Sequence, residues 1–177
     1  MSSFADRIGG AIKLSPSLYE EVEHDENALH QAMAVVMLSS VAAGLGAGAV
    51  LGLRGFFWAI LSAFVGWYFW AVVVYFVGTR ILGTPNTRTD MGELLRVIGF
   101  ASAPGIFRIF GVFTSIQSIV FVVAAIWMLI AMVIAVRQAL DYLSTGRAIA
   151  VCIVGWLSQY FLILVLARFI QLFYTTA

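Results

Sequence analysis

The sequence predicts an all-α membrane protein with five transmembrane helices, and three observations lead to that class. First, 62% of the 177 residues are hydrophobic and 11% are charged, whereas a soluble domain is about 45–50% apolar and about 25% charged. Second, the mean hydropathy is +1.00, and a soluble fold of this size cannot remove so much apolar surface from water. Third, the apolar runs are long and do not alternate, which is typical of membrane helices and not of β-barrel strands. A soluble enzyme, a nucleic-acid-binding protein and a disordered scaffold are therefore excluded.

Residues 1–28 are predicted to form a cytoplasmic amphipathic and juxtamembrane segment. Phe4, Ile8 and Ile12 recur at helical spacing, which predicts a short helix on the membrane surface. Ser15 and Pro16 form a typical helix start and predict a second helix. This acidic segment lacks the apolar core of a signal peptide, so the first span is expected to be its own uncleaved insertion signal.

Residues 29–177 are predicted to form a five-span helical membrane domain. The expected spans are residues 29–53, 56–79, 94–113, 119–136 and 148–174. Arg54 and Gly55 alone separate the first two runs, which predicts a tight hairpin. Asp90 is expected to cap the helix that leads into the third run, with Glu93 at the third helical position as a capping-box partner. The third run is the weakest, because Pro104 and Gly105 interrupt it and Pro104 should kink or break the helix.

The distribution of basic residues predicts the orientation of the chain. Five spans place one group on the side of the N-terminus: Arg7, Lys13, Arg80, Arg88, Arg96, Arg137 and Arg147. The other side holds Arg54, Arg108 and Arg168. The positive-inside rule then predicts a cytoplasmic N-terminus and a C-terminus on the opposite side. A four-span alternative, with the third run dipping in and returning, would remove this asymmetry.

All nine carboxylates fall on the predicted cytoplasmic side, so the three arginines opposite have no acidic partner there. Arg54, Arg108 and Arg168 are expected either to extend to lipid phosphates or to form a basic rim. Such a rim would select an anionic headgroup or the carboxylates of a partner.

A ladder of small residues in the first span predicts close helix packing. Ser40, Gly44, Gly48 and Gly52 stand four residues apart and share one face of the helix. The partner is open at this point: it is either the second span of the same chain or a helix of another protein or of a second copy.

Aromatic residues crowd the second span, and Trp67, Tyr68, Phe69 and Trp70 cover all sides of its middle. Lipid contact and packing explain them, with a flat cofactor such as a quinone or carotenoid as the alternative. The middle of every span lacks Asp, Glu, Lys and His, and Gln159 is among its deepest polar groups. A small transporter or channel component would use Gln159 and the break at Pro104.

No catalytic or metal-binding pattern is found. The chain has no serine elbow, zinc-binding helix or phosphate loop. His24 and His30 lie in the acidic juxtamembrane segment, where two histidines without cysteines do not make a zinc pattern. The expectation is therefore that the protein is not an enzyme and has no catalytic residue, metal or cofactor.

The third to fifth runs resemble the Yip family, the Ypt/Rab-interacting membrane proteins. The segment Gly92–Pro104 is similar to the entry into that family's third span. The run from Ile126 to Leu140, followed by Thr145–Ala148, is similar to its fourth span and the following link. The resemblance implies five spans, a cytoplasmic N-terminus and, given the short N-terminal segment, a bacterial-type member in the inner membrane.

The resemblance and the residues together predict a non-enzymatic membrane protein acting in membrane organisation or protein–protein interaction. Its expected partners are the lipid bilayer, anionic headgroups, and other membrane proteins or itself through the glycine-rich first span. Eukaryotic relatives bind prenylated small GTPases, an activity that the short N-terminal segment does not favour here. Two alternatives remain: an accessory subunit of a larger respiratory or photosynthetic complex, and a small transporter or channel component.

Overall fold

Every regular element in the described part of the chain, residues 2–47 and 52–176 of a computed structural model, is a helix. In chain order the elements are α1 (Phe4–Ile12), α2 (Pro16–His24), α3 (Ala28–Gly46), α4 (Gly52–Phe76), the π-helix η1 (Val77–Ile81), α5 (Met91–Ala101), the 3₁₀-helix η2 (Ala103–Val112), α6 (Gln117–Ala139) and α7 (Thr145–Thr176). The all-α prediction is confirmed.

Four helical segments are long and apolar enough to cross a membrane: Ala28–Gly46, Leu61–Ile81, Met91–Val112 and Gln117–Ala139. They correspond to the first four predicted spans, so the count of five is not confirmed within the described residues. The predicted fifth span falls on α7, where many side chains lie outside the description.

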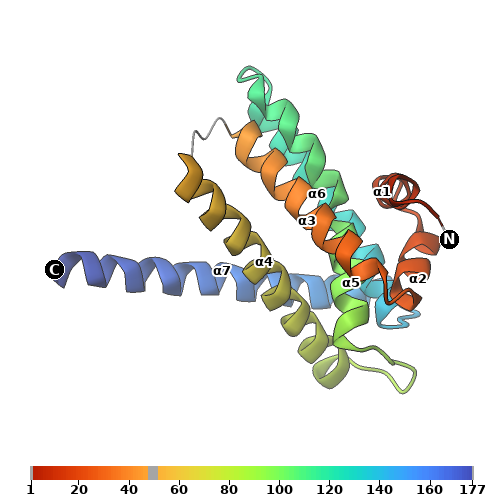
Figure 1. Cartoon of the computed structure of the whole chain (residues 1–177). Coiled ribbons are helices and arrows are strands. Elements are labelled where there is room, and N and C mark those ends of the chain that lie inside the picture. The colour runs from red at the N-terminus through yellow and green to blue at the C-terminus, as the bar shows by residue number, and fades with distance from the viewer. Residues whose placement is uncertain (1, 48–51, 177) are drawn as a thin grey trace.

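The packed centre of the molecule is made by α3, α5, η2 and α6, while α4 and α7 diverge from it (Figure 1). Side chains such as Val35, Val97, Phe100 and Val136 are fully buried in this centre. Helix α7 contacts α4 and α6 and then extends away from the other helices (Figure 1).

The first connection differs from the expected hairpin at Arg54 and Gly55. Helix α3 ends at Gly46, with Ala47 as its C-cap, and α4 has begun at Gly52. Arg54 and Gly55 therefore belong to α4, and the connection precedes them.

The third predicted span is built from two helices of different geometry. Helix α5 ends at Ala101, and η2 begins at Ala103 with Pro104 in its first turn. Proline lacks the backbone donor that an α-helix needs and is tolerated at the start of a new helix. At the other end of α5, Asp90 and Glu93 form a reciprocal capping box, as the sequence predicts.

The short helices α1 and α2 pack against the helical centre, with α1 contacting η2, α2 and α5, and α2 contacting α5 and α6. Tyr19 and Val22 of α2 are fully buried there. The indole nitrogen of Trp127 in α6 donates to the carbonyl of Ile12, at 2.9 Å, and so holds the end of α1. The N-terminal segment is thus part of the folded unit.

Candidate functional site

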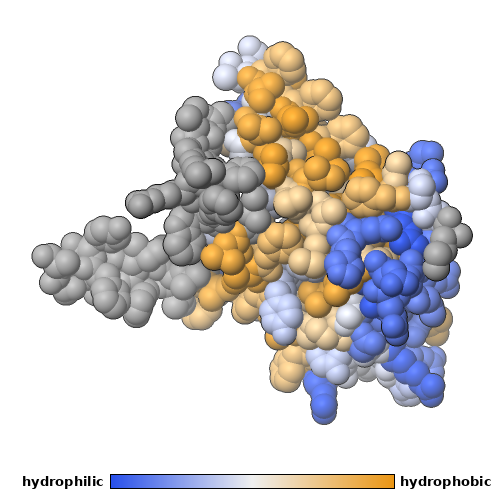
Figure 2. Space-filling view, viewed as in Figure 1, coloured by the Kyte–Doolittle hydropathy of each residue, from blue (hydrophilic) through white to orange (hydrophobic). Residues whose placement is uncertain are grey.

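Hydrophilic residues collect around α1 and α2, and apolar residues cover much of the rest of the visible, coloured surface (Figure 2). We call this region the polar end. It comprises α1, α2, the turn between α2 and α3, the link between η1 and α5, the first turn of α5, and the link between α6 and α7. All nine carboxylates of the sequence lie in these segments.

Arg7 joins the first three helices at the polar end. Its side chain is 2% exposed, and its Nη2 lies 2.6 Å from Asp25 Oδ2 and 2.9 Å from Glu21 Oε1. Its Nη1 donates to Gln31 Oε1 of α3 at 2.9 Å. Hydrogen bonds and the charge of Arg7 act to lower the pKa values of Asp25 and Glu21, in each case against desolvation. For Glu21, the largest contribution to the lower pKa is a hydrogen bond from Ser2.

Arg96 ties α5 to the end of α2. Its Nε donates to the carbonyl of Val22 at 2.9 Å, and its Nη2 donates to the carbonyl of Glu23. The last carbonyls of a helix lack partners within the helix. The buried guanidinium therefore satisfies the C-terminal end of α2 from another helix, which fixes the position of Glu23.

A polar cavity of about 460 Å³ opens beside the end of α2. Its lining consists of Glu20, Glu23, His24, Arg88, Glu93, Arg137, Gln138, Asp141, Tyr142 and Leu143. These residues come from α2, the link before α5, the first turn of α5, the end of α6 and the link before α7. Segments far apart in the sequence thus bring four carboxylates and two arginines to one place.

Glu23 is the buried carboxylate of this cavity, with 7% of the residue exposed. Desolvation raises its pKa to about 7, and the negative charge of Glu93 adds to the rise. Within the described residues, ion pairs form at Arg7 and not at the cavity. Among the described residues, the carboxylate of Glu23 has no salt bridge and no hydrogen-bond donor, and His24 acts on it through its charge alone.

Tyr142 forms one wall of the cavity and fixes the link before α7. Its hydroxyl donates to the carbonyl of Gly78 at 2.7 Å and contacts that of Leu82 at 3.1 Å. These carbonyls belong to the π-helical turn at the end of α4 and to its cap. Arg137 Nε in turn donates to the carbonyl of Tyr142, at 3.2 Å.

The break at Pro104 is satisfied from within the protein. The Ser102 hydroxyl donates to the carbonyl of Gly99 at 2.6 Å, and Arg108 Nε donates to that of Gly105 at 3.2 Å. Arg108 Nη2 also donates to Ser39 Oγ of α3, at 2.9 Å. Gln159 lies against Gly66 of α4 and has no recorded bond to this break.

The three arginines that were expected to meet lipid or a partner differ in their surroundings. Arg108 is partly buried and bonded inside the protein, as described above. Arg168 is exposed on α7, and the side chain of Arg54 lies outside the described residues.

The glycines in the described part of α3 differ in their surroundings. A Cβ on Gly44 would meet nothing within 4 Å, whereas one on Gly46 would overlap the backbone carbonyl of Arg108. Ser40 donates to the carbonyl of Val36 in its own helix. Gly48 lies outside the described residues, and Gly52 begins α4. The described part of the ladder is thus open at Gly44.

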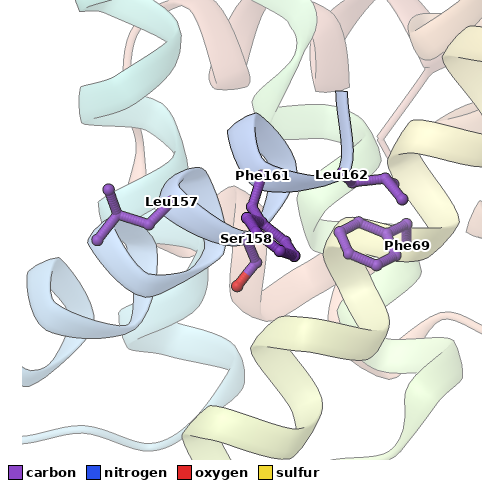
Figure 3. Close-up of a pocket in the computed structure, with 5 residues that line it drawn as sticks. All are labelled: Phe69, Leu157, Ser158, Phe161 and Leu162. Carbon is purple, nitrogen blue, oxygen red and sulfur yellow. The ribbon is translucent and has the colours of Figure 1, made fainter. Parts of the chain in front are cut away.

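An apolar groove of about 610 Å³ separates α4 from α7, and its lining is Phe69, Leu157, Ser158, Phe161 and Leu162. Phe69 extends from α4 toward α7, where Phe161 and Leu162 lie beside it (Figure 3). Ser158 bonds to the carbonyl of Val154 in its own helix, so it offers the groove little polarity. The groove is therefore an apolar surface within the predicted membrane region.

Two polar atoms are buried without partners where α4 and α7 meet. Trp70 packs on Gly155, and its Nε1 has no hydrogen-bond acceptor. Gln159 Oε1 is likewise buried without a donor. A buried polar group without a partner costs free energy, so this crossing is less well satisfied than the break at Pro104.

No cluster of three or more potential metal-ligating side chains is found in the described residues. The aromatic residues of α4 divide by environment, since Trp70 is 6% exposed and Tyr68 is 55% exposed. Trp67 donates to the carbonyl of Leu95. Packing and an outward-facing surface thus account for these three side chains.

Sequence reasoning did not identify the structural roles of Arg7, Glu23 and Tyr142. Each is an ordinary residue in a polar segment, and its role depends on contacts with other helices. The acidic residues near the end of α2 gave a partial signal, because Glu23 directly follows the apolar residue Val22 near the buried side of the helix.

The helices, their apolar surfaces and the polar end define a multi-span integral membrane protein. The sequence profile of the Yip1 domain matches residues 14–166, and the chain belongs to that family. No curated protein and no solved structure matches it.

Proposed function

We propose that this Yip family member is a non-enzymatic protein of membrane organisation that binds other membrane proteins or copies of itself. The apolar groove between α4 and α7 carries the proposal. Membrane helices associate through packing and through hydrogen bonds that lipid cannot supply. A helix in this groove would replace lipid at Phe69, Phe161 and Leu162.

The topology proposed with this function has five spans. Helix α7 supplies the fifth, because it is a continuous helix from Thr145 to Thr176 and a span needs about 20 residues. The polar end then faces the cytoplasm, and the far end of α7 reaches the opposite side of a bacterial inner membrane. The concentration of Arg and Lys at the polar end supports this orientation.

Filling the groove tests the proposal. Ser158→Trp places a large side chain in the groove, and Ile153→Trp places the same side chain at an exposed position of the same helix, outside the groove. We expect the native protein and Ile153→Trp to purify in mild detergent as an oligomer or with a stoichiometric membrane partner. Ser158→Trp should lose that association while keeping its thermal stability.

Light scattering after size-exclusion chromatography measures the mass of the complex. A monomer of native sequence with no partner would overturn the proposal, as would an equal effect of the two tryptophan variants. An accessory-subunit role would appear as a fixed ratio to subunits of one larger complex. Solute flux into vesicles that contain the purified protein alone would instead indicate the transporter alternative.

A further inference from the structure

We propose that the polar cavity at the end of α2 is a binding site for an alkylammonium group, with Glu23 as its innermost ligand. This site lies at the polar end, apart from the α4–α7 groove. The binding of an amine and the association of membrane helices can therefore fail independently.

The charges of the cavity favour a cation. Its carboxylates are Glu20, Glu23, Glu93 and Asp141, and its guanidinium groups are Arg88 and Arg137. No salt bridge joins the two sets in this structure. With His24 neutral, the lining carries more negative than positive charge, and an ammonium group would offset the difference.

Glu23 is the observation that makes this more than an acidic surface. Its side chain lines the cavity, the residue is 7% exposed, and its carboxylate has no recorded donor. A buried carboxylate is costly unless a cation or hydrogen-bond donors compensate it. An ammonium group supplies both its charge and three donors.

The basic residues nearby do not take this place. Arg96 donates to the backbone carbonyls of Val22 and Glu23 in α2. Arg137 uses its Nε on the carbonyl of Tyr142 and is otherwise exposed. Arg88 is exposed on the link before α5. His24 has its Nδ1 2.8 Å from the carbonyl of Glu20 and acts on Glu23 through charge alone. The carboxylate of Glu23 is thus left without a bonded cation from its own chain.

The arrangement fits an organic cation better than a metal ion. A bound calcium or magnesium ion needs several oxygen ligands at about 2.0–2.6 Å. No group of at least three His, Cys, Asp or Glu side chains in the described residues is close enough to hold a metal. The carboxylates instead surround a cavity of about 460 Å³, in which an ammonium group on a flexible chain can meet Glu23 first and the outer carboxylates along its length.

Cadaverine is the probe for this site, because it carries the alkylammonium chemistry of a lysine side chain in soluble form. The full-length protein in mild detergent is titrated with cadaverine at pH 8, and the thermal unfolding midpoint is recorded. We expect the midpoint to rise in a saturable manner. Pentanediol, which has hydroxyl groups in place of the amines, should produce no rise.

Two variants and one control connect the effect to the cavity. Glu23→Gln should weaken cadaverine binding by at least about tenfold, since it removes one charge-assisted contact. Asp141→Asn should weaken it less, because Asp141 is exposed and has a positive φ that asparagine also adopts. Glu26→Gln removes an exposed carboxylate of the same segment that does not line the cavity, and it should bind as the native protein does.

The pH dependence supplies a second readout. The groups around Glu23 are Glu20, His24, Arg88, Glu93, Arg96, Arg137, Asp141 and Tyr142. Binding should weaken from pH 8 to pH 6, because Glu23 gains a proton and His24 gains a positive charge. The proposal is overturned by an equal midpoint rise in Glu23→Gln, by a rise with pentanediol, or by an equal rise with sodium chloride at the same ionic strength.

A lysine side chain of a protein or a free amine could supply the ammonium group, and a further experiment distinguishes these two sources. A short peptide with one central lysine is compared with the same peptide carrying norleucine. Tighter binding of the lysine peptide than of cadaverine identifies a lysine side chain of a protein as the natural ligand. Tighter binding of cadaverine identifies a free amine, and no binding of either overturns the proposal.

Discussion

Arg7 of α1 and Asp25, which follows α2, meet at 2.6 Å although most of the two helices lies between them in the sequence. The same guanidinium also contacts Glu21 and Gln31. One buried side chain therefore holds the two N-terminal helices and the start of α3 in a fixed arrangement.

Replacing Arg7 is expected to release α1. Arg7→Ala leaves Asp25 and Glu21 without their cation, and removing one partner of a buried pair is strongly destabilising. Because both carboxylates keep contact with water, we expect a loss of about 2 kcal/mol in the free energy of unfolding. Thermal unfolding in detergent measures it. Lys13→Ala, an exposed basic residue at the end of the same helix, is the control, and an equal loss there would contradict the role of Arg7.

The stability of the protein should fall as the pH rises through the range in which Glu23 titrates. Its pKa is raised from 4.5 to about 7 in the folded state, so the folded state binds more protons than the unfolded state between these values. The free energy of unfolding should decrease from about pH 4.5 to about pH 7, by on the order of 2 kcal/mol.

Glu23→Gln should remove this dependence, because an amide does not titrate. The variant should equal the native protein in stability near pH 4.5 and exceed it at pH 8. Thermal midpoints at several pH values provide the measurement, with Glu26→Gln as the exposed control. A native-like slope in Glu23→Gln would place the titration on another group.

Gly46 and Gly44 are expected to respond differently to the same substitution. Gly46→Leu should destabilise the fold by at least about 3 kcal/mol, because the new side chain overlaps the backbone of Arg108, which cannot move aside as a side chain can. Gly44→Leu should leave the unfolding midpoint nearly unchanged, since its Cβ has open space.

The variants Gly46→Leu and Gly44→Leu together distinguish packing inside the chain from contact with another molecule. If the open face of Gly44 joins a partner helix, Gly44→Leu reduces the mass of the complex in mild detergent without loss of stability. An unchanged mass would exclude that face from the interface, and an unstable Gly44→Leu would show that its surroundings are not open.

Tyr142→Phe removes the hydroxyl that contacts the carbonyls of Gly78 and Leu82. Because those carbonyls lie at the π-helical turn, we expect a loss of about 1–2 kcal/mol in the free energy of unfolding. Tyr160→Phe is the control, since Tyr160 is 64% exposed and has no recorded hydrogen bond. Equal stability of the two variants would mean that water replaces the lost hydroxyl.

The proposed five-span topology predicts the location of three reporter fusions. Fusions at Arg88 and Ser144 should report the cytoplasm, and a fusion at Ala177 should report the opposite side. An enzyme that is active only in the periplasm, paired with a fluorescent protein that matures in the cytoplasm, makes the measurement. A cytoplasmic signal at Ala177 would refute five spans.

Features that depend on near neighbours in the chain could be predicted from the sequence. Hydropathy identified the four described helical segments that are long and apolar enough to cross a membrane, and the chemistry of proline located the change from α5 to η2 at Pro104. The capping box of Asp90 and Glu93 was predicted for the same reason, because both residues lie within one helical turn. These features depend on backbone geometry and solvent, which a short stretch of residues already specifies.

The boundary between the first two spans was harder to predict from the sequence. Residues 47–56 are small or apolar apart from Arg54, so hydropathy alone does not mark where α3 ends. Helix α3 ends at Gly46, at the point where it closely approaches Arg108 of η2. Gln117 also donates to the carbonyl of Gly46, at 2.8 Å.

The sequence by itself determined that this is a helical membrane protein of the Yip family, and it determined which residues are polar. Only the tertiary structure decided which glycine is at a helix contact, and that Arg7 and Glu23 are buried. In a membrane protein, an apolar helix face looks the same in sequence whether lipid or another helix covers it. Contacts between distant segments, and not local pattern, therefore create the cavity around Glu23 and the groove between α4 and α7.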